Sequence, residues 1–190
     1  SIALFLALLK KKCIIVPIVS KITKDIKQKA KIAHVKKTIN INLKGKLSIN
    51  EFNVNHENKL VTKLFKQGNA GLILFSSGST GQPKAMIHNL DNFIESFKGR
   101  KSRNLNILVF LLFDHIGGLN TLINALSIGS HLILPTDRNA LSIAALIEKH
   151  KINVLPASPT FLNMMLMENV ANKFDLSSLK MITYGTEQMQ

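Results

Sequence analysis

One stretch near the middle of the chain constrains its fold more than any other. An apolar run, Leu72–Phe75, gives way to nine small, polar or helix-breaking residues, Ser76–Lys84, and an apolar run resumes at Ala85–Ile87. This pattern predicts a strand, a loop and a second strand. Pro83 disfavours helical backbone angles at Gln82, so the loop is not expected to open a helix.

The loop carries groups that suit an anion with many oxygens. Gly78 and Gly81 let main-chain N–H groups approach a ligand closely. Lys84 adds a positive charge, and four hydroxyls can donate hydrogen bonds, those of Ser76, Ser77, Ser79 and Thr80. These groups favour a polyphosphate. The loop is not a Walker A motif, which runs G-x-x-x-x-G-K-[ST] into a helix. A surface turn or Gly/Ser linker is the alternative.

The run S-S-G-S-T-G-Q-P-K at Ser76–Lys84 resembles the phosphate loop of the adenylate-forming superfamily, which usually reads T/S-S-G-T/S-T-G-x-P-K-G. That superfamily contains acyl- and aryl-CoA synthetases, luciferases and the adenylation domains of nonribosomal peptide synthetases. Ala85 stands where glycine is usual. The resemblance implies that the loop, including Gly81, holds the phosphates of ATP and that Lys84 is catalytic.

A second loop, Phe113–Leu119, follows the predicted strand Ile107–Leu112. Ligands of open α/β sheets gather at such strand ends. Two interpretations stay open: His115 lines a pocket, or Asp114 caps the next helix while His115 bonds to backbone. The loop resembles P-x-F-H-x-x-G-L of the acyl-CoA members, which makes His115 a gating, catalytic residue beside the carboxylate. The pair Phe113-Asp114 also resembles F-D-x-S of the adenylation domains, where the aspartate holds an amine. The alignment with the acyl-CoA members is favoured, so Asp114 is not assigned as an amine ligand.

A third segment, Tyr184–Glu187, follows the predicted strand Leu179–Thr183. It resembles a family segment that packs along adenine and the acyl pocket, which assigns Gly185, Thr186 and Glu187 to the nucleotide pocket. The spacing is one residue short of the family's Y-G-x-T-E motif, so Glu187 is not assigned to a metal. A simple turn at the strand end is the alternative.

From about residue 104 onward, helices alternate with short apolar strands, which predicts a largely parallel sheet covered by helices on both faces. The resemblance implies a layered α/β fold, the N-terminal domain of the superfamily. Residues 1–190 are expected to be an incomplete copy of that one domain, lacking the small C-terminal domain and the glutamate that binds magnesium.

Some local features are predicted from the residues alone. The Asn-rich residues 48–55 predict a loop, and Ser158 or Thr160 is expected to cap a helix over Phe161–Met167. Core filling is expected from three methionines, Met164, Met165 and Met167.

The composition narrows the possible partners. The formal net charge is +14, but only three of the 25 basic residues are arginine, and there is no tryptophan. Excess lysine usually marks a solvated surface, so we expect no specific nucleic-acid partner. The apolar N-terminal run is too short to span a bilayer, so no transmembrane segment is predicted.

Cys13 is the only cysteine, which excludes an internal disulfide and a multi-cysteine metal site. A buried structural thiol and a reducing, cytoplasmic setting are expected.

The resemblance implies a reaction in which a small carboxylic acid attacks ATP, giving an acyl-adenylate and pyrophosphate. Mg²⁺ would bridge the phosphate oxygens, and CoA or the phosphopantetheine of a carrier protein would take the acyl group, as in fatty acid metabolism. Residues 1–190 alone are expected to have no turnover. The alternative is a non-catalytic homologue that binds a nucleotide or another polyanion.

Overall fold

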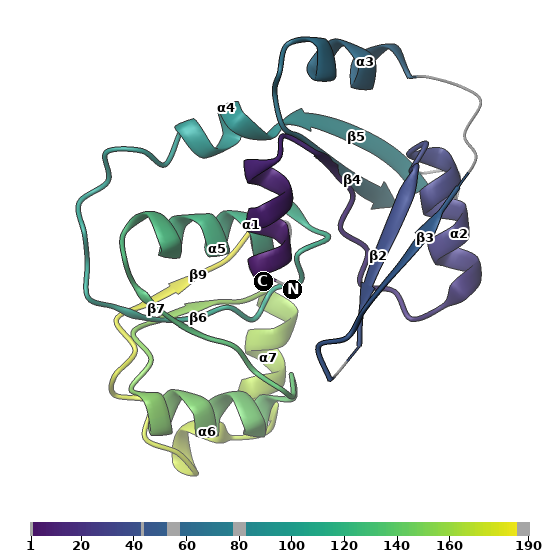
Figure 1. The fold of residues 1–190 in the computed structure, drawn as a ribbon. Coiled ribbons are helices and arrows are strands. Elements are labelled where there is room, and N and C mark those ends of the chain that lie inside the picture. Colours follow the sequence, from purple (N-terminus) through teal and green to yellow (C-terminus); the bar gives the residue numbers. More distant parts are fainter. Residues whose placement is uncertain (1, 43, 53–57, 78–82, 186–190) are drawn as a thin grey trace. The chain divides into compact units, whose positions relative to one another are not determined.

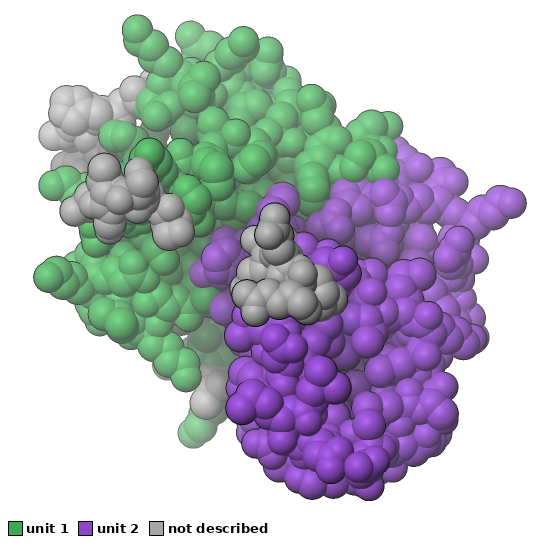
Figure 2. All heavy atoms as spheres, turned by 180° about the vertical axis from the view of Figure 1, so that it is seen from behind, with its two compact units in different colours: residues 1–96 green, residues 97–190 purple. Residues whose placement is uncertain are grey.

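The computed structural model describes residues 2–42, 44–52, 58–77 and 83–185. The chain forms two compact units, residues 1–96 and 97–190 (Figure 2). The sequence contains no linker-like stretch at this boundary.

Unit 1 is built around a sheet in the order β1-β4-β5, in which β1 runs parallel and β5 antiparallel to β4 (Figure 1). A separate antiparallel pair, β2–β3, forms a second sheet. The described helices are α1 (Ile2–Lys10), α2 (Thr23–Ile32), α3 (Lys59–Lys66) and α4 (Leu90–Glu95). The described strands are β1 (Ile14–Ile15), β2 (Lys37–Ile41), β3 (Leu47–Glu51), β4 (Gly71–Ser77) and β5 (Pro83–Asn89).

The apolar run in β4 forms the centre of unit 1, because Leu72, Ile73 and Leu74 are all buried. Asp91 at the start of α4 anchors this sheet. Its carboxylate accepts a hydrogen bond from the backbone N–H of Ala70 at 2.8 Å and pairs with Lys12 at 2.6 Å.

Unit 2 contains a parallel sheet in the order β7-β6-β8-β9. Its described helices are α5 (Ile116–Ser127), α6 (Ala140–His150), α7 (Pro159–Met167) and a short 3-10 helix, η1 (Val170–Asn172). Its described strands are β6 (Asn106–Leu108), β7 (His131–Ile133), β8 (Val154–Pro156) and β9 (Met181–Thr183).

Helices cover both faces of this sheet, as the sequence predicts. Successive residues of a strand point to opposite faces. Ile107 packs with Ala125 of α5, whereas its neighbour Leu108 belongs to the cluster that contains residues of α6 and α7. The α/β fold with a parallel sheet is therefore confirmed.

Several local expectations are wrong. Residues 48–51 of the expected loop belong to strand β3, because their backbone groups pair with β2. Strand β6 ends at Leu108, four residues before the predicted end. Cys13 is half-buried instead of buried. Of the three methionines in α7, only Met165 is buried, and Ser158 rather than Thr160 is the helix cap, accepting a hydrogen bond from the N–H of Phe161.

Among the described helices, none has both the length and the apolarity to cross a membrane.

Candidate functional site

The β4–β5 hairpin holds the two ends of the predicted phosphate loop together. The antiparallel register places Ser76 opposite Lys84 and Ser77 opposite Pro83. Residues directly opposite each other in an antiparallel pair share one face of the sheet, so the Ser76 and Lys84 side chains lie on the same face. The two predicted strands are confirmed, while Gly78, Ser79, Thr80 and Gly81 between them lie outside the described residues.

Lys84 is exposed, and its ammonium group makes no ion pair or hydrogen bond with any described residue. An ammonium group without a protein partner keeps its donors and its charge for a ligand. Ser76 is half-buried beside it. The described end of the hairpin therefore combines one hydroxyl and one cation on a single face, a donor set that suits an anionic ligand such as phosphate.

The hairpin is held rigidly below the loop. The pairing runs without a break from Gly71–Asn89 to Ser77–Pro83, and the first half of β4 is buried. On the other face of the sheet, the ammonium of Lys29 lies 5.8 Å from the centre of the Phe75 ring. The loop thus starts directly after an immobilised strand, which favours precise placement of a ligand.

His115 occupies the N-cap position of α5, with extended backbone angles and no capping hydrogen bond from its side chain. The side chain is 66% exposed, and its Nε2 lies 3.7 Å from Oδ1 of Asp114. That Oδ1 is buried and has no hydrogen-bond partner in the described part of the chain. The interpretation of Asp114 as a helix cap is therefore wrong, because the carboxylate precedes the cap position and receives no backbone N–H.

Gly118 fixes the position of this loop, a role that the sequence analysis missed. A Cβ added at Gly118 would lie 2.1 Å from the carbonyl oxygen of Leu112 and 2.9 Å from that of Leu111. Only glycine lets the first turn of α5 approach the backbone of the preceding loop this closely. The sequence signal for this role was the G-L pair of the motif P-x-F-H-x-x-G-L, which Gly118 and Leu119 match.

Gly185 follows β9, as His115 follows β6 after a short loop. Both strands belong to the same parallel sheet, separated by β8, so both segments lie at its carboxyl edge. Ligands of open α/β sheets bind at this edge. Thr186 and Glu187 lie outside the described residues.

A search of the described residues finds no cluster of three His, Cys, Asp or Glu side chains that would hold a metal ion. The described residues therefore supply donors for phosphate oxygens but no complete set of magnesium ligands.

The fold first defines a class: an α/β protein in which a glycine- and hydroxyl-rich segment of the sequence joins the two strands of a hairpin. The family model for AMP-binding enzymes matches residues 2–190, and the chain belongs to this family.

Named relatives agree with this assignment. The chain is 35% identical to the indoleacetate–CoA ligase of Aromatoleum aromaticum over 123 residues, which are 60% of this chain and 24% of that protein. It is 29% identical to 4-coumarate–CoA ligase-like 9 of Arabidopsis thaliana over 127 residues, 63% of this chain and 23% of the relative. The chain thus spans about a quarter of the length of these curated relatives.

Solved structures give the same fold. The luciferase-like enzyme of the mealworm Zophobas morio superposes with a TM-score of 0.53 at 26% identity, covering 64% of this chain and 29% of that one. The N-terminal domain of FACL13 from Mycobacterium tuberculosis superposes with a TM-score of 0.55 at 22% identity, covering 74% of this chain and 34% of that one. These matches support the adenylate-forming N-terminal fold.

Proposed function

We propose that the full-length protein joins a carboxylic acid to the α-phosphate of ATP, forming an acyl-adenylate and releasing pyrophosphate. Membership of the AMP-binding family supports this reaction, and the curated relatives include several CoA ligases. The observation that carries the proposal is the pairing of Ser76 with Lys84, which presents at the end of the hairpin a hydroxyl and a cation that has no partner among the described residues.

In this proposal, Ser76–Gly81 and Lys84 hold the β- and γ-phosphates. The carboxylate oxygen attacks the α-phosphorus, and the bond to the bridging oxygen of the β-phosphate breaks. Catalysis of such a step comes mainly from orienting the two reactants and neutralising the charge that grows on the leaving pyrophosphate. The ammonium of Lys84 would supply part of that neutralisation. Bound Mg²⁺ would add charge stabilisation at the phosphate oxygens.

Residues at the carboxyl edge of the sheet in unit 2 would supply further roles in the reaction. His115 is exposed there and would gate access to the carboxylate, while Gly185, Thr186 and Glu187 would line the nucleotide pocket. A Cβ at Gly185 would meet no described atom within 4 Å, so the backbone at this position is open to a ligand.

A thiol would accept the acyl group in a second step. CoA is the preferred acceptor, because the relatives are named CoA ligases, and the phosphopantetheine of a carrier protein is the alternative. The substrate would be a small carboxylic acid, and the reaction would take place in the cytoplasm.

The proposal is tested by the variant Lys84→Ala in the full-length protein, assayed by carboxylate-dependent ATP–pyrophosphate exchange. Loss of one electrostatic contact to a developing charge typically lowers kcat by about 10²–10³. Lys36→Ala is the matched control, because Lys36 is also exposed. If the two variants retain the same exchange rate, Lys84 does not act on the phosphates.

A non-catalytic role is the second candidate, and the formal charge of +14 favours it. In that case the full-length protein would bind ATP or another polyanion but would exchange no pyrophosphate with any carboxylate. Residues 1–190 alone are expected to be inactive under both readings, so the full-length protein is the one to assay.

A further inference from the structure

The positive charge of this chain is concentrated in unit 1. Residues 1–96 contain sixteen lysines against five acidic residues, an excess of eleven in a total net charge of +14. All three arginines lie in unit 2. Neither the hairpin loop nor its proposed reaction uses this charge, apart from Lys84.

Two helices of unit 1 each present a row of three exposed lysines. Side chains spaced by three or four residues share one face of a helix. The row of α2 is Lys24, Lys27 and Lys31, and the row of α3 is Lys59, Lys63 and Lys66. Within the described ranges, none of the six ammonium groups forms an ion pair or a hydrogen bond. In α2 the carboxylate of Asp25 pairs instead with Lys29, at 3.1 Å.

Both helices cover the same face of the sheet. The end of α2 and the start of α3 line one small cavity of about 70 Å³, together with three residues of a single sheet face, Ile73, Ala85 and Ile87. The opposite side of α3 packs against the sheet, where Leu64 lies against Gly71 of β4. The two lysine rows therefore lie on one layer of unit 1, away from the sheet. We call these six lysines the basic face.

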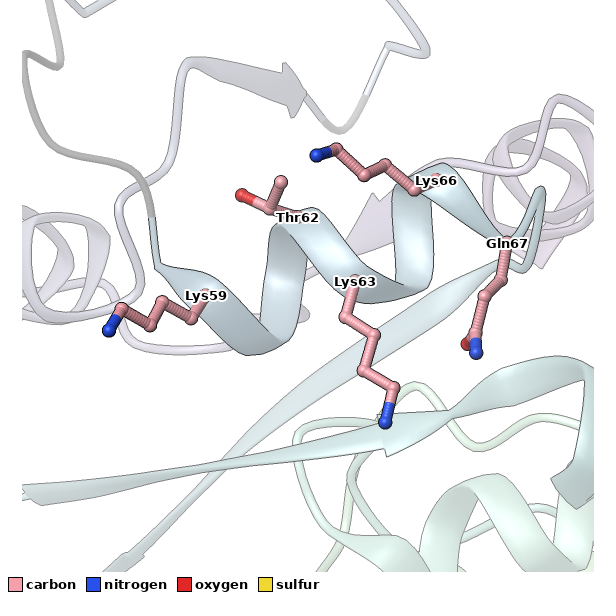
Figure 3. Close-up of a pocket in the computed structure, with 5 residues that line it drawn as sticks. All are labelled: Lys59, Thr62, Lys63, Lys66 and Gln67. Carbon is pink, nitrogen blue, oxygen red and sulfur yellow. The ribbon is translucent and has the colours of Figure 1, made fainter.

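The lysines of α3 do not converge on one point. Lys59, Lys63 and Lys66 line a shallow hollow with Thr62 and Gln67, but their side chains leave the helix in different directions (Figure 3). A single phosphate could not contact all three ammonium groups. The partner must therefore carry negative charge spread over a surface.

Large apolar side chains accompany the basic face. Phe65 of α3 is 73% exposed, and Ile22, directly before α2, is 67% exposed. Lysines beside exposed apolar side chains are typical of segments that lie in the interface of an anionic bilayer, where the apolar groups enter the boundary below the headgroups. Recognition of nucleic acid instead favours arginine, which unit 1 lacks.

We propose that the basic face of unit 1 binds the surface of an anionic membrane, with Phe65 and Ile22 entering the headgroup region. This is peripheral binding, and it does not depend on the adenylation reaction. Each lysine near an anionic membrane contributes about one kcal/mol, and a tenfold change in affinity corresponds to about 1.4 kcal/mol. Removal of three lysines should therefore weaken binding about a hundredfold.

The test is co-sedimentation of the full-length protein with phosphatidylcholine vesicles that contain phosphatidylserine. The triple variant Lys59→Gln, Lys63→Gln, Lys66→Gln should bind about a hundredfold more weakly than the wild type, as should Lys24→Gln, Lys27→Gln, Lys31→Gln. Glutamine keeps the helix propensity of lysine, so both variants should fold, which circular dichroism checks. The control with an equal change in charge is Lys101→Gln, Lys149→Gln, Lys173→Gln, three exposed lysines of unit 2, and it should bind like the wild type.

Vesicle binding by the variant Phe65→Ala and binding of duplex DNA by the wild type separate a membrane from a nucleic acid as the partner. Phe65→Ala should abolish the binding that persists at high salt, where charge interactions are screened. Three results would each overturn the proposal: no preference of the wild type for vesicles with phosphatidylserine, equal losses in the unit 1 and unit 2 triple variants, or binding of duplex DNA by the basic face without binding of vesicles.

Discussion

The close approach of α5 to the loop before it makes Gly118→Ala the sharpest test of the structure around His115. The new Cβ would lie 2.1 Å from the carbonyl oxygen of Leu112, where real Cβ contacts stay above 3.0 Å, so the helix or the loop must move by about 0.9 Å. Neither neighbour is the flexible end of a side chain, because both nearest groups are backbone. Overpacking of this kind costs about 1–3 kcal/mol or somewhat more.

Alanine also favours a helix over glycine by up to about 1 kcal/mol, which offsets part of that cost. We therefore expect Gly118→Ala to lower the free energy of unfolding by about 1–2 kcal/mol, measured by equilibrium urea denaturation of the full-length protein. Hydrogen exchange should show the loss of protection at the start of α5.

Gly117→Ala is the matched control. Its Cβ would lie 3.5 Å from a methyl group of Leu111, an ordinary contact, so only the gain in helix propensity remains. We expect it to be neutral or to stabilise by up to about 1 kcal/mol. Equal effects of the two substitutions would refute the close contact between α5 and the loop.

Three other predictions concern unit 2. Asn153 accepts a hydrogen bond from the N–H of Asn106 at 2.9 Å, so Asn153→Ala should cost about 1–3 kcal/mol in urea denaturation. Ser158→Ala removes the cap of α7 and should cost about 1 kcal/mol, seen as a lower thermal midpoint. The hydrogen bond from Lys151 holds the pKa of Asp175 well below its ordinary value of 3.8. The ionised carboxylate therefore stabilises the fold above pH 3.8, and this stabilisation is lost as the pH falls through the lowered pKa. The urea midpoints of the wild type and of Asp175→Asn should accordingly converge in acid. A difference between the two midpoints that is independent of pH would contradict the pairing.

The hairpin could be predicted from the sequence because its signals are local. Apolar runs on both sides of the polar segment define the strands, and Pro83 disfavours helical backbone angles at Gln82. In the second half of the chain, helices alternate with short apolar strands, and this local pattern likewise predicts the parallel sheet. Each of these signals lies within a few neighbouring residues.

The missed features depend on contacts between distant segments. Strand β3 is exposed along its length, and its backbone is satisfied by pairing with β2. The need for glycine at Gly118 arises from the bend that brings the backbone of Leu112 against α5. Met164 and Met167 are exposed because α7 turns only one side toward the core, and an almost wholly apolar helix does not reveal which side that is.

The most direct test of the proposed reaction is carboxylate-dependent exchange of labelled pyrophosphate into ATP by the full-length protein, over a panel of aryl and alkyl carboxylic acids. We predict that label enters ATP only when an accepted carboxylate and Mg²⁺ are present, and that Lys84→Ala reduces the rate by about 10²–10³. Formation of ADP and phosphate in place of exchange, or no exchange with any carboxylate, would contradict adenylation.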